Sequence, residues 1–295
     1  TCSGVGIVFG SAATGITAVP HTLKFLMGSN FSERCQPLPP DIVTLDQLFR
    51  LFSNSISRKQ AGSDLFYTFA SDIPSLDASL VDTICDTSRF LSKYSRRSSI
   101  VRWVLIFDAV AIRRWFEESP ENWMEVESQI DAVVYLMRWD QEMIKKYLAD
   151  RDILATPLVV EKIYEVTGGW PYLLNELWKL MKDPANIQDP RKPADLLKER
   201  LADNADGIAD GFLAALGVDE VECGLEMVNM FKELGSISRN EIDDGIKTYG
   251  NAKLLDLSRE KVGVSLETLH RLNVLVESEA GLEVEAIAAG VIGKR

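Results

Sequence analysis

Several residue types that commonly carry chemistry are scarce in these 295 residues. There are two histidines and four cysteines, and no pair of cysteines has the CxxC spacing. A metal site, a disulfide framework and a Cys–His or Ser–His pair therefore have no local signature. The scattered cysteines are typical of a reducing cytoplasm, which is the compartment we expect. They are Cys2, Cys35, Cys85 and Cys223.

Long apolar runs are also missing. No run approaches the ~18 residues of a membrane-spanning helix, so no membrane partner is expected. The chain starts at Thr1, and its first ten residues have no basic segment, so they do not resemble a signal peptide. We expect the chain to be a piece of a longer protein. Its net charge of −12 argues against broad contact with nucleic-acid phosphates.

The phosphate-binding motif GxxxxGK[ST] occurs nowhere in the chain. The nearest candidate is the small-residue loop Gly10–Gly15, which follows a predicted strand over Gly4–Phe9. This loop has no lysine that could reach a phosphate. The sequence therefore predicts that this chain alone does not hydrolyse ATP.

Two continuous apolar runs, Ile100–Val110 and Ala132–Met137, predict buried strands of a parallel α/β sheet. Helical spacing of apolar residues predicts helices around these strands. They are expected over 21–27, 45–52, 75–94, 111–118 and, capped by Asp140, over 141–149.

The sequence Thr167-Gly168-Gly169-Trp170-Pro171 interrupts a stretch with helical hydrophobic spacing. A glycine inside a helix costs about 1 kcal/mol and an interior proline about 3 kcal/mol. The pattern therefore predicts two helices, with a break at the two glycines and with Pro171 opening the second helix, where no backbone N–H is needed. The junction is either an ordinary corner between helices or a place where backbone approaches a ligand closely.

A polar, proline-rich stretch over 183–193 predicts a linker between domains. After it, helices predicted over 222–234, 239–248 and 265–272 are followed by a hairpin signal over 274–284, which is the order of a winged helix. Residues 205–295 contain nine Lys/Arg against 17 Asp/Glu, a net charge of −8. This excess of acidic residues disfavours DNA as the partner.

Some polar and aromatic residues near these elements have two interpretations each. Asp108 lies near the end of the strand predicted over Ile100–Val110, and Arg113 and Arg114 follow on a helix. Either all three lie at a nucleotide edge, or Asp108 caps that helix and the two arginines solvate its exposed face. Arg138 either pairs with Asp140 or Glu142 or contacts phosphate. Trp170 is either a core residue or an exposed platform that stacks on adenine.

The segment "IYEVTGGWPYLLNELW" resembles the Gly-x-Pro segment in the helical lid of STAND and related AAA+ P-loop NTPases, in which the proline packs near the adenine. With the strands before it and the winged-helix order after it, the resemblance covers residues 102–295. It implies an incomplete α/β NTPase-like domain over 1–140, a helical lid over 141–200 and a winged-helix domain over 205–295. The nucleotide-binding residues that it implies are Gly168, Gly169, Trp170, Pro171, Asp108, Arg113 and Arg114.

On this resemblance the chain looks like the C-terminal half of a regulatory ATPase that acts as a nucleotide-dependent conformational switch. Either the P-loop precedes residue 1 or the nucleotide site is degenerate, and the first is the expectation. The resemblance implies ATP or ADP with Mg²⁺ as ligands of the intact protein, and protein partners or the missing N-terminal region as contacts. A non-enzymatic interaction scaffold and a winged-helix transcription regulator remain as alternatives.

Overall fold

The computed structural model describes residues 4–19, 35–37, 63–70, 76–94, 100–108, 115–116, 119–153, 155–182 and 191–292. The predicted helices over 21–27 and 45–52 lie outside these residues, as do Arg113 and Arg114. The chain divides into two compact units. The first comprises Thr1–Gly10 and Ile16–Leu136, and the second comprises Ser11–Gly15 and Met137–Arg295.

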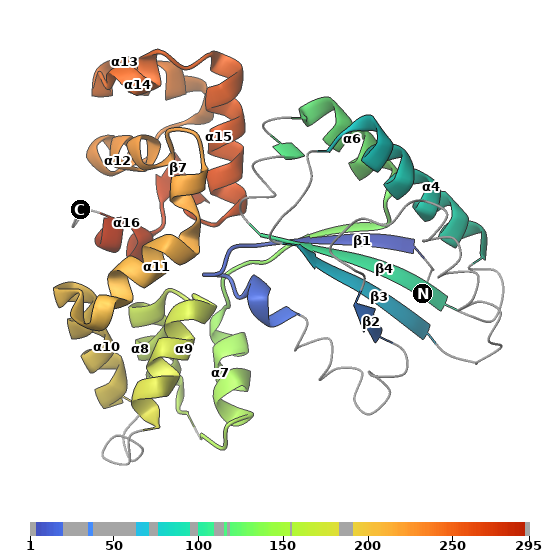
Figure 1. The fold of residues 1–295 in the computed structure, drawn as a ribbon. Coiled ribbons are helices and arrows are strands. Elements are labelled where there is room, and N and C mark those ends of the chain that lie inside the picture. The colour runs from blue at the N-terminus through green and yellow to red at the C-terminus, as the bar shows by residue number, and fades with distance from the viewer. Residues whose placement is uncertain are drawn as a thin grey trace. The chain divides into compact units, whose positions relative to one another are not determined.

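The first unit contains a parallel sheet in the order β2-β3-β4-β1-β5 (Figure 1). The predicted parallel α/β sheet is confirmed, and it is larger than expected because the sequence analysis did not predict β2 and β3. The strands are β1 (Gly4–Phe9), β2 (Cys35–Pro37), β3 (Ser63–Ala70), β4 (Ile100–Phe107) and β5 (Ala132–Tyr135).

Helices α4 (Ala78–Tyr94) and α6 (Pro120–Gln129) lie together on one face of this sheet (Figure 1). Alternate residues of β1, Val5, Ile7 and Phe9, are fully buried, as expected for the covered face of a strand. The Phe9 ring lies 5.3 Å from that of Trp123 on α6. The predicted helix over 75–94 is confirmed. Only Trp115 and Phe116 of the helix expected over 111–118 are described.

The second unit begins with a group of helices. Asp140 caps the first of them, since its Oδ1 accepts a 2.7 Å hydrogen bond from the Met143 amide, as predicted. Of the linker predicted over 183–193, residues 183–190 lie outside the described residues. Residues 191–193 belong to a helix that begins at Arg191 and has Pro193 in its first turn, where proline is tolerated. The helices are α7 (Gln141–Ala149), α8 (Pro157–Thr167), α9 (Pro171–Met181) and α10 (Arg191–Asp203).

The rest of the second unit consists of further helices and an antiparallel hairpin. The hairpin is the predicted one, and the strands pair Leu275 with Val284 and Ser278 with Gly281. The elements are α11 (Ile208–Leu216), α12 (Gly224–Leu234), α13 (Ile242–Tyr249), α14 (Ala252–Leu255), α15 (Arg259–Arg271), β6 (Leu275–Ser278), β7 (Gly281–Val284) and α16 (Ala286–Ile292). Short 3₁₀ turns occupy Ile16–Ala18 in the first unit and Ala205–Gly207, Val218–Glu220 and Arg239–Glu241 in the second.

Among the described residues, no helix is both long enough and apolar enough to span a bilayer. These residues also include no group of three or more His, Cys, Asp or Glu side chains that could hold a metal ion.

Candidate functional site

The glycine junction, defined here as residues 168–171, joins α8 to α9 as the sequence predicted. Gly168 ends α8 with a φ of 57°, and Gly169 follows with a φ of 74°. Both values lie in the left-handed region that glycine adopts at little cost. Pro171 is the first residue of α9, where its missing N–H leaves no hydrogen bond unmade.

The backbone that precedes α7 lies against this junction. The Trp139 amide donates a 2.8 Å hydrogen bond to the carbonyl of Gly169. A Cβ built on Gly169 would overlap the carbonyl oxygen of Trp139. Glycine is therefore required at position 169 for two reasons, its φ and this close approach of two backbones.

Trp170 is a core residue rather than an exposed platform. Its exposed fraction is 0 %, and its ring packs edge-on against Phe212 with 5.5 Å between the ring centroids. Its indole nitrogen Nε1 donates a 3.0 Å hydrogen bond to Oε2 of Glu285. The alternative of an exposed indole that stacks on adenine is wrong, because no part of this ring reaches solvent.

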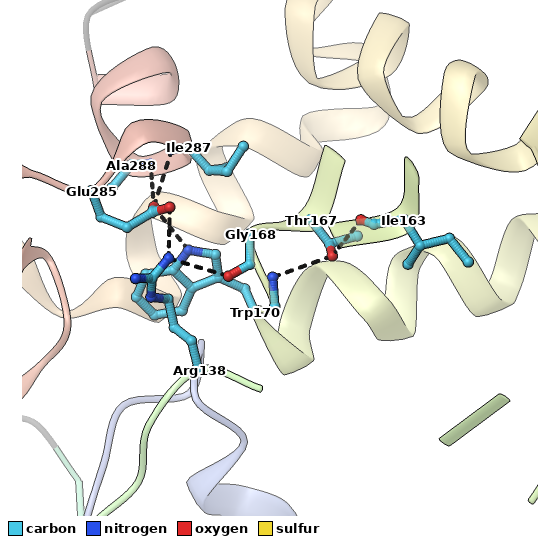
Figure 2. A network of polar contacts seen from close by, with 9 residues as sticks. Arg138, Ile163, Thr167, Gly168, Trp170, Glu285, Ile287 and Ala288 are labelled. Carbon is cyan, nitrogen blue, oxygen red and sulfur yellow. Dashed lines mark hydrogen bonds and ion pairs between the residues drawn. The ribbon is translucent and has the colours of Figure 1, made fainter. Parts of the chain in front are cut away.

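Arg138 also contacts Glu285 (Figure 2). Its Nη1 lies 2.8 Å from Oε1 of Glu285 and donates a second hydrogen bond, of 3.2 Å, to the carbonyl of Gly168. Both alternatives for Arg138 assumed a local carboxylate or a phosphate. The structure instead gives it a carboxylate 147 residues along the chain, which no local sequence pattern could indicate.

The loop Ser11–Gly15 reaches the same junction from the other end of the sequence. The Tyr172 amide donates a 3.1 Å hydrogen bond to the Ala13 carbonyl. A Cβ built on Gly15, whose φ is 83°, would lie 3.3 Å from Cβ of Pro171. Burial raises the pKa of the Tyr172 hydroxyl, and the nearby Glu176 carboxylate raises it further, so this group stays protonated at neutral pH.

The loop is closed by its own hydrogen bonds. The Ser11 amide donates to Oγ1 of Thr14 at 2.9 Å, and the Thr14 amide donates to the Ser11 carbonyl at 3.1 Å. The amide of Gly15 donates to the Ala12 carbonyl at 3.2 Å, and that of Ala13 donates to the Ala215 carbonyl at 2.9 Å. These four N–H groups are therefore already committed within the chain.

The position of this loop in the sequence has a topological meaning. It directly follows β1, and β1 lies between β4 and β5 in the sheet. After β1 the chain crosses to β2, which lies at one edge of the sheet, beyond β4 and β3. After β4 it crosses in the opposite direction, past β1, to β5. In open parallel sheets, ligands bind outside the carboxyl ends of the strands at such a reversal.

The remaining predicted site residues belong to the first unit or are not described. Asp108 directly follows β4 and is half-buried in the first unit, and the glycine junction belongs to the second unit. Arg113 and Arg114 lie outside the described residues. Glu285 was missed by sequence reasoning, because a single acidic residue after a predicted strand carries no signal.

No protein-family profile matches this chain. No curated protein matches it either. Among solved structures, the chain is similar to a Walker-type ATPase of Pyrococcus abyssi, with a TM-score of 0.54 and 12 % identity over 99 % of this chain and 91 % of that one. It is also similar to the ORC2 protein of Aeropyrum pernix, solved in ADPNP and ADP complexes, with a TM-score of 0.50 and 15 % identity over 99 % of this chain and 87 % of that one.

The chain thus has an α/β fold of the AAA+-like P-loop NTPase type. The similarity extends over nearly the whole chain, so the expectation that it covers only residues 102–295 was too narrow. The expected range was too short because β1, β2 and β3 all lie in the first hundred residues. Together with β4 and β5 they form the complete sheet, of which the sequence indicated only a part.

Proposed function

We propose that this chain is a regulatory member of the STAND and AAA+-like ATPase class that acts as a nucleotide-dependent conformational switch. Residues 141–200 form its helical lid, and residues 205–295 form its winged-helix domain. The fold that the chain shares with the Walker-type ATPase and with the ORC2 protein supports the class. The order of α12, α13, α15, β6 and β7 supports the winged helix.

One observation carries the proposal: the Ala13 carbonyl of the loop after β1 accepts a hydrogen bond from the amide of Tyr172, the residue that directly follows the glycine junction. This loop directly follows β1, the strand at which the order of the sheet reverses, and ligands of open parallel sheets bind beyond the carboxyl end of such a strand. ATP or ADP bound at the loop would therefore contact the segment that begins the lid. Gly168, Gly169 and Pro171 would line this site through their backbone and ring, while buried Trp170 would support them from behind.

Hydrolysis is not part of the proposal. A phosphate-cradling loop offers its backbone N–H groups and a lysine to the phosphates. Here the loop has no lysine, and the amides of Ser11, Ala13, Thr14 and Gly15 are bonded within the chain. Of the two alternatives for the missing P-loop, we now favour a degenerate site, with Mg²⁺ as a companion of the bound nucleotide rather than a catalyst.

The charges of the proposed winged helix favour a protein over DNA as its partner. Cations on or beside α15 have acidic partners in the same domain: Lys261 pairs with Glu222 at 2.9 Å, and Arg271 pairs with Glu267 at 2.8 Å. Arg239 pairs with Glu277 of the hairpin at 2.9 Å. DNA phosphates would have to displace these carboxylates from a domain with a net charge of −8. A transcription regulator that reads DNA through this face is disfavoured for the same reason.

A non-enzymatic interaction scaffold is the second candidate function. The self-bonded loop favours it, because closing the loop leaves few N–H groups for a phosphate, and Gly15 lies directly against Pro171. In a scaffold, the sheet and the C-terminal domain would dock a protein partner, and nucleotide would have no effect.

Calorimetry with ATP and with ADP in the presence of Mg²⁺ separates the two candidates. The proposed switch predicts micromolar binding, about −8 kcal/mol, by the wild type. Pro171→Ala should abolish this binding, because it removes the ring that lies against Gly15. Pro157→Ala is the matched control, since Pro157 also opens a helix but is exposed and lies at the opposite end of α8 from the junction. Absence of binding by the wild type would refute the switch and leave the scaffold.

A further inference from the structure

Glu285 is a buried acidic side chain held by donors from three separate segments. Its side chain is 5 % exposed, and it lies between the end of β7 and the start of α16. Oε1 accepts from Arg138 at 2.8 Å. Oε2 accepts from Trp170 Nε1 at 3.0 Å and from the amides of Ile287 and Ala288 at 3.1 and 3.0 Å (Figure 2).

A carboxylate this deeply buried is costly unless its oxygens are fully bonded. Here both carboxylate oxygens accept hydrogen bonds, and the side-chain donors have few other acceptors within reach. Loss of the carboxylate would leave the indole N–H of Trp170 buried without its acceptor and would leave Arg138 with the Gly168 carbonyl and the Trp170 ring, 5.7 Å away. Loss of the carboxylate would therefore destabilise both α16, which follows Glu285, and the segments that contain Arg138 and Trp170.

The glycine junction packs directly on this carboxylate. A Cβ built on Gly168 would lie 3.0 Å from Oε1 of Glu285 and 2.8 Å from Cγ1 of Ile287. Arg138 bonds the same glycine through its carbonyl. Residues 168–170 therefore have little freedom to move while Glu285 stays in place.

The other side of the same short segment is held by the loop after β1. Tyr172, two residues after Trp170, donates its amide to Ala13, and Ala13 donates its own amide to Ala215 on α11. A stretch of five residues, 168–172, thus has Glu285 as its partner at one end and the loop Ser11–Gly15 at the other. Any rearrangement of the loop that breaks the bond from Tyr172 to Ala13 removes the hydrogen bond that fixes residues 168–172 at this end.

From this arrangement we infer that Glu285 couples the loop Ser11–Gly15 to α16. While its carboxylate binds Arg138 and Trp170, the glycine junction keeps the position in which the Tyr172 amide binds Ala13 of the loop. When the loop opens, the contacts of Glu285 with Arg138 and Trp170 weaken, and α16 becomes free to move. The inference deepens the proposed function only in naming the residue through which the switch acts, and the coupling itself operates without nucleotide.

Amide hydrogen exchange on the full chain tests this coupling, because contacts alone do not demonstrate it. Glu285→Gln removes the charge and keeps the shape. We expect exchange at residues 11–15 to rise about tenfold, although Glu285 bonds none of them. Glu277→Gln is the matched control, because it breaks the exposed pair with Arg239 in the same unit, and it should leave residues 11–15 unchanged.

Coupling between two sites is reciprocal, which gives a second arm. Thr14→Val removes the side-chain bonds that close the loop and should likewise raise exchange at residues 286–292. Thr248→Val removes a comparable bond, from Oγ1 to the Asp244 carbonyl on α13, and should not do so. If Glu285→Gln fails to fold, Trp170→Phe removes a single donor to Glu285 and should give the same pattern at a smaller factor.

Three outcomes would overturn the inference. Faster exchange confined to the mutated side would show two independent contacts. A uniform rise over all of 137–292 would show a general loss of stability. A rise in one arm with none in the other would contradict reciprocal coupling. Since no nucleotide is present, absence of ATP binding in the calorimetry would refute the proposed switch and leave this result untouched.

Discussion

Gly169→Ala is the substitution whose cost the structure defines best. The new Cβ would overlap the carbonyl oxygen of Trp139, which belongs to backbone that is itself bonded to Gly169 and cannot turn away freely. The left-handed φ of 74° costs a non-glycine residue about 1–2 kcal/mol. Relief of an overlap in a packed region costs about 1–3 kcal/mol more. The expected loss of unfolding free energy is therefore about 2–5 kcal/mol for the second unit.

Gly207→Ala separates these two contributions. Gly207 has a similar φ of 67°, but a Cβ built on it meets no atom within 4 Å. It should cost only the conformational part, about 1–2 kcal/mol. Urea unfolding of both variants, followed by tryptophan fluorescence and by circular dichroism, measures the difference. Equal losses for the two variants would refute the argument that close approach of backbone requires glycine at position 169.

Three further predictions concern single side chains. Trp170→Phe keeps an aromatic ring in the core and removes one donor to buried Glu285, and we expect a loss of about 1–3 kcal/mol in the same urea assay. The hydrogen bond from Lys253 holds the pKa of Glu226 below its ordinary value, so this pair stabilises the fold above the unfolded-state pKa and ceases to do so as the pH falls through the folded-state pKa. The difference in urea midpoint between wild type and Glu226→Gln should therefore be present at neutral pH and vanish in acid. Burial raises the pKa of the Cys85 thiol, so iodoacetamide at neutral pH should leave Cys85 unmodified in the folded chain and modify it once urea unfolds the protein.

Local signals allowed much of the fold to be predicted. The apolar run of β1, the cap at Asp140 and the turn between β6 and β7 each lie within a few residues of the structure that they specify. The glycine junction was also predicted, because Gly168, Gly169 and Pro171 are costly inside a helix and have a clear use at a break between two helices.

The missed parts depend on partners far along the chain. β3 has a run of strand-forming residues, Leu65–Phe69, but it begins with Ser63 and Asp64, and its pairing with β4 was not visible in either segment alone. The candidate site is a stronger case, since Arg138 and Trp170 meet Glu285 across 147 and 115 residues. No periodicity relates residues at such separations, so only the folded chain could bring them together.

The division of the chain has a consequence for any attempt to dissect it. The second unit draws five residues, Ser11–Gly15, from a place more than a hundred residues before its main part begins at Met137. A fragment cut at this boundary would lack Ala13, which accepts from Tyr172 and donates to Ala215. Such a fragment lacks the residues that pack against Tyr172 and Ala215 in the second unit. During synthesis, a ribosome that has made residues 11–15 must add some two hundred more residues before Ala215, their last partner, is present. Separating the two units intact therefore requires a change in the order of the segments along the chain, because a single cut leaves residues 11–15 with the wrong unit.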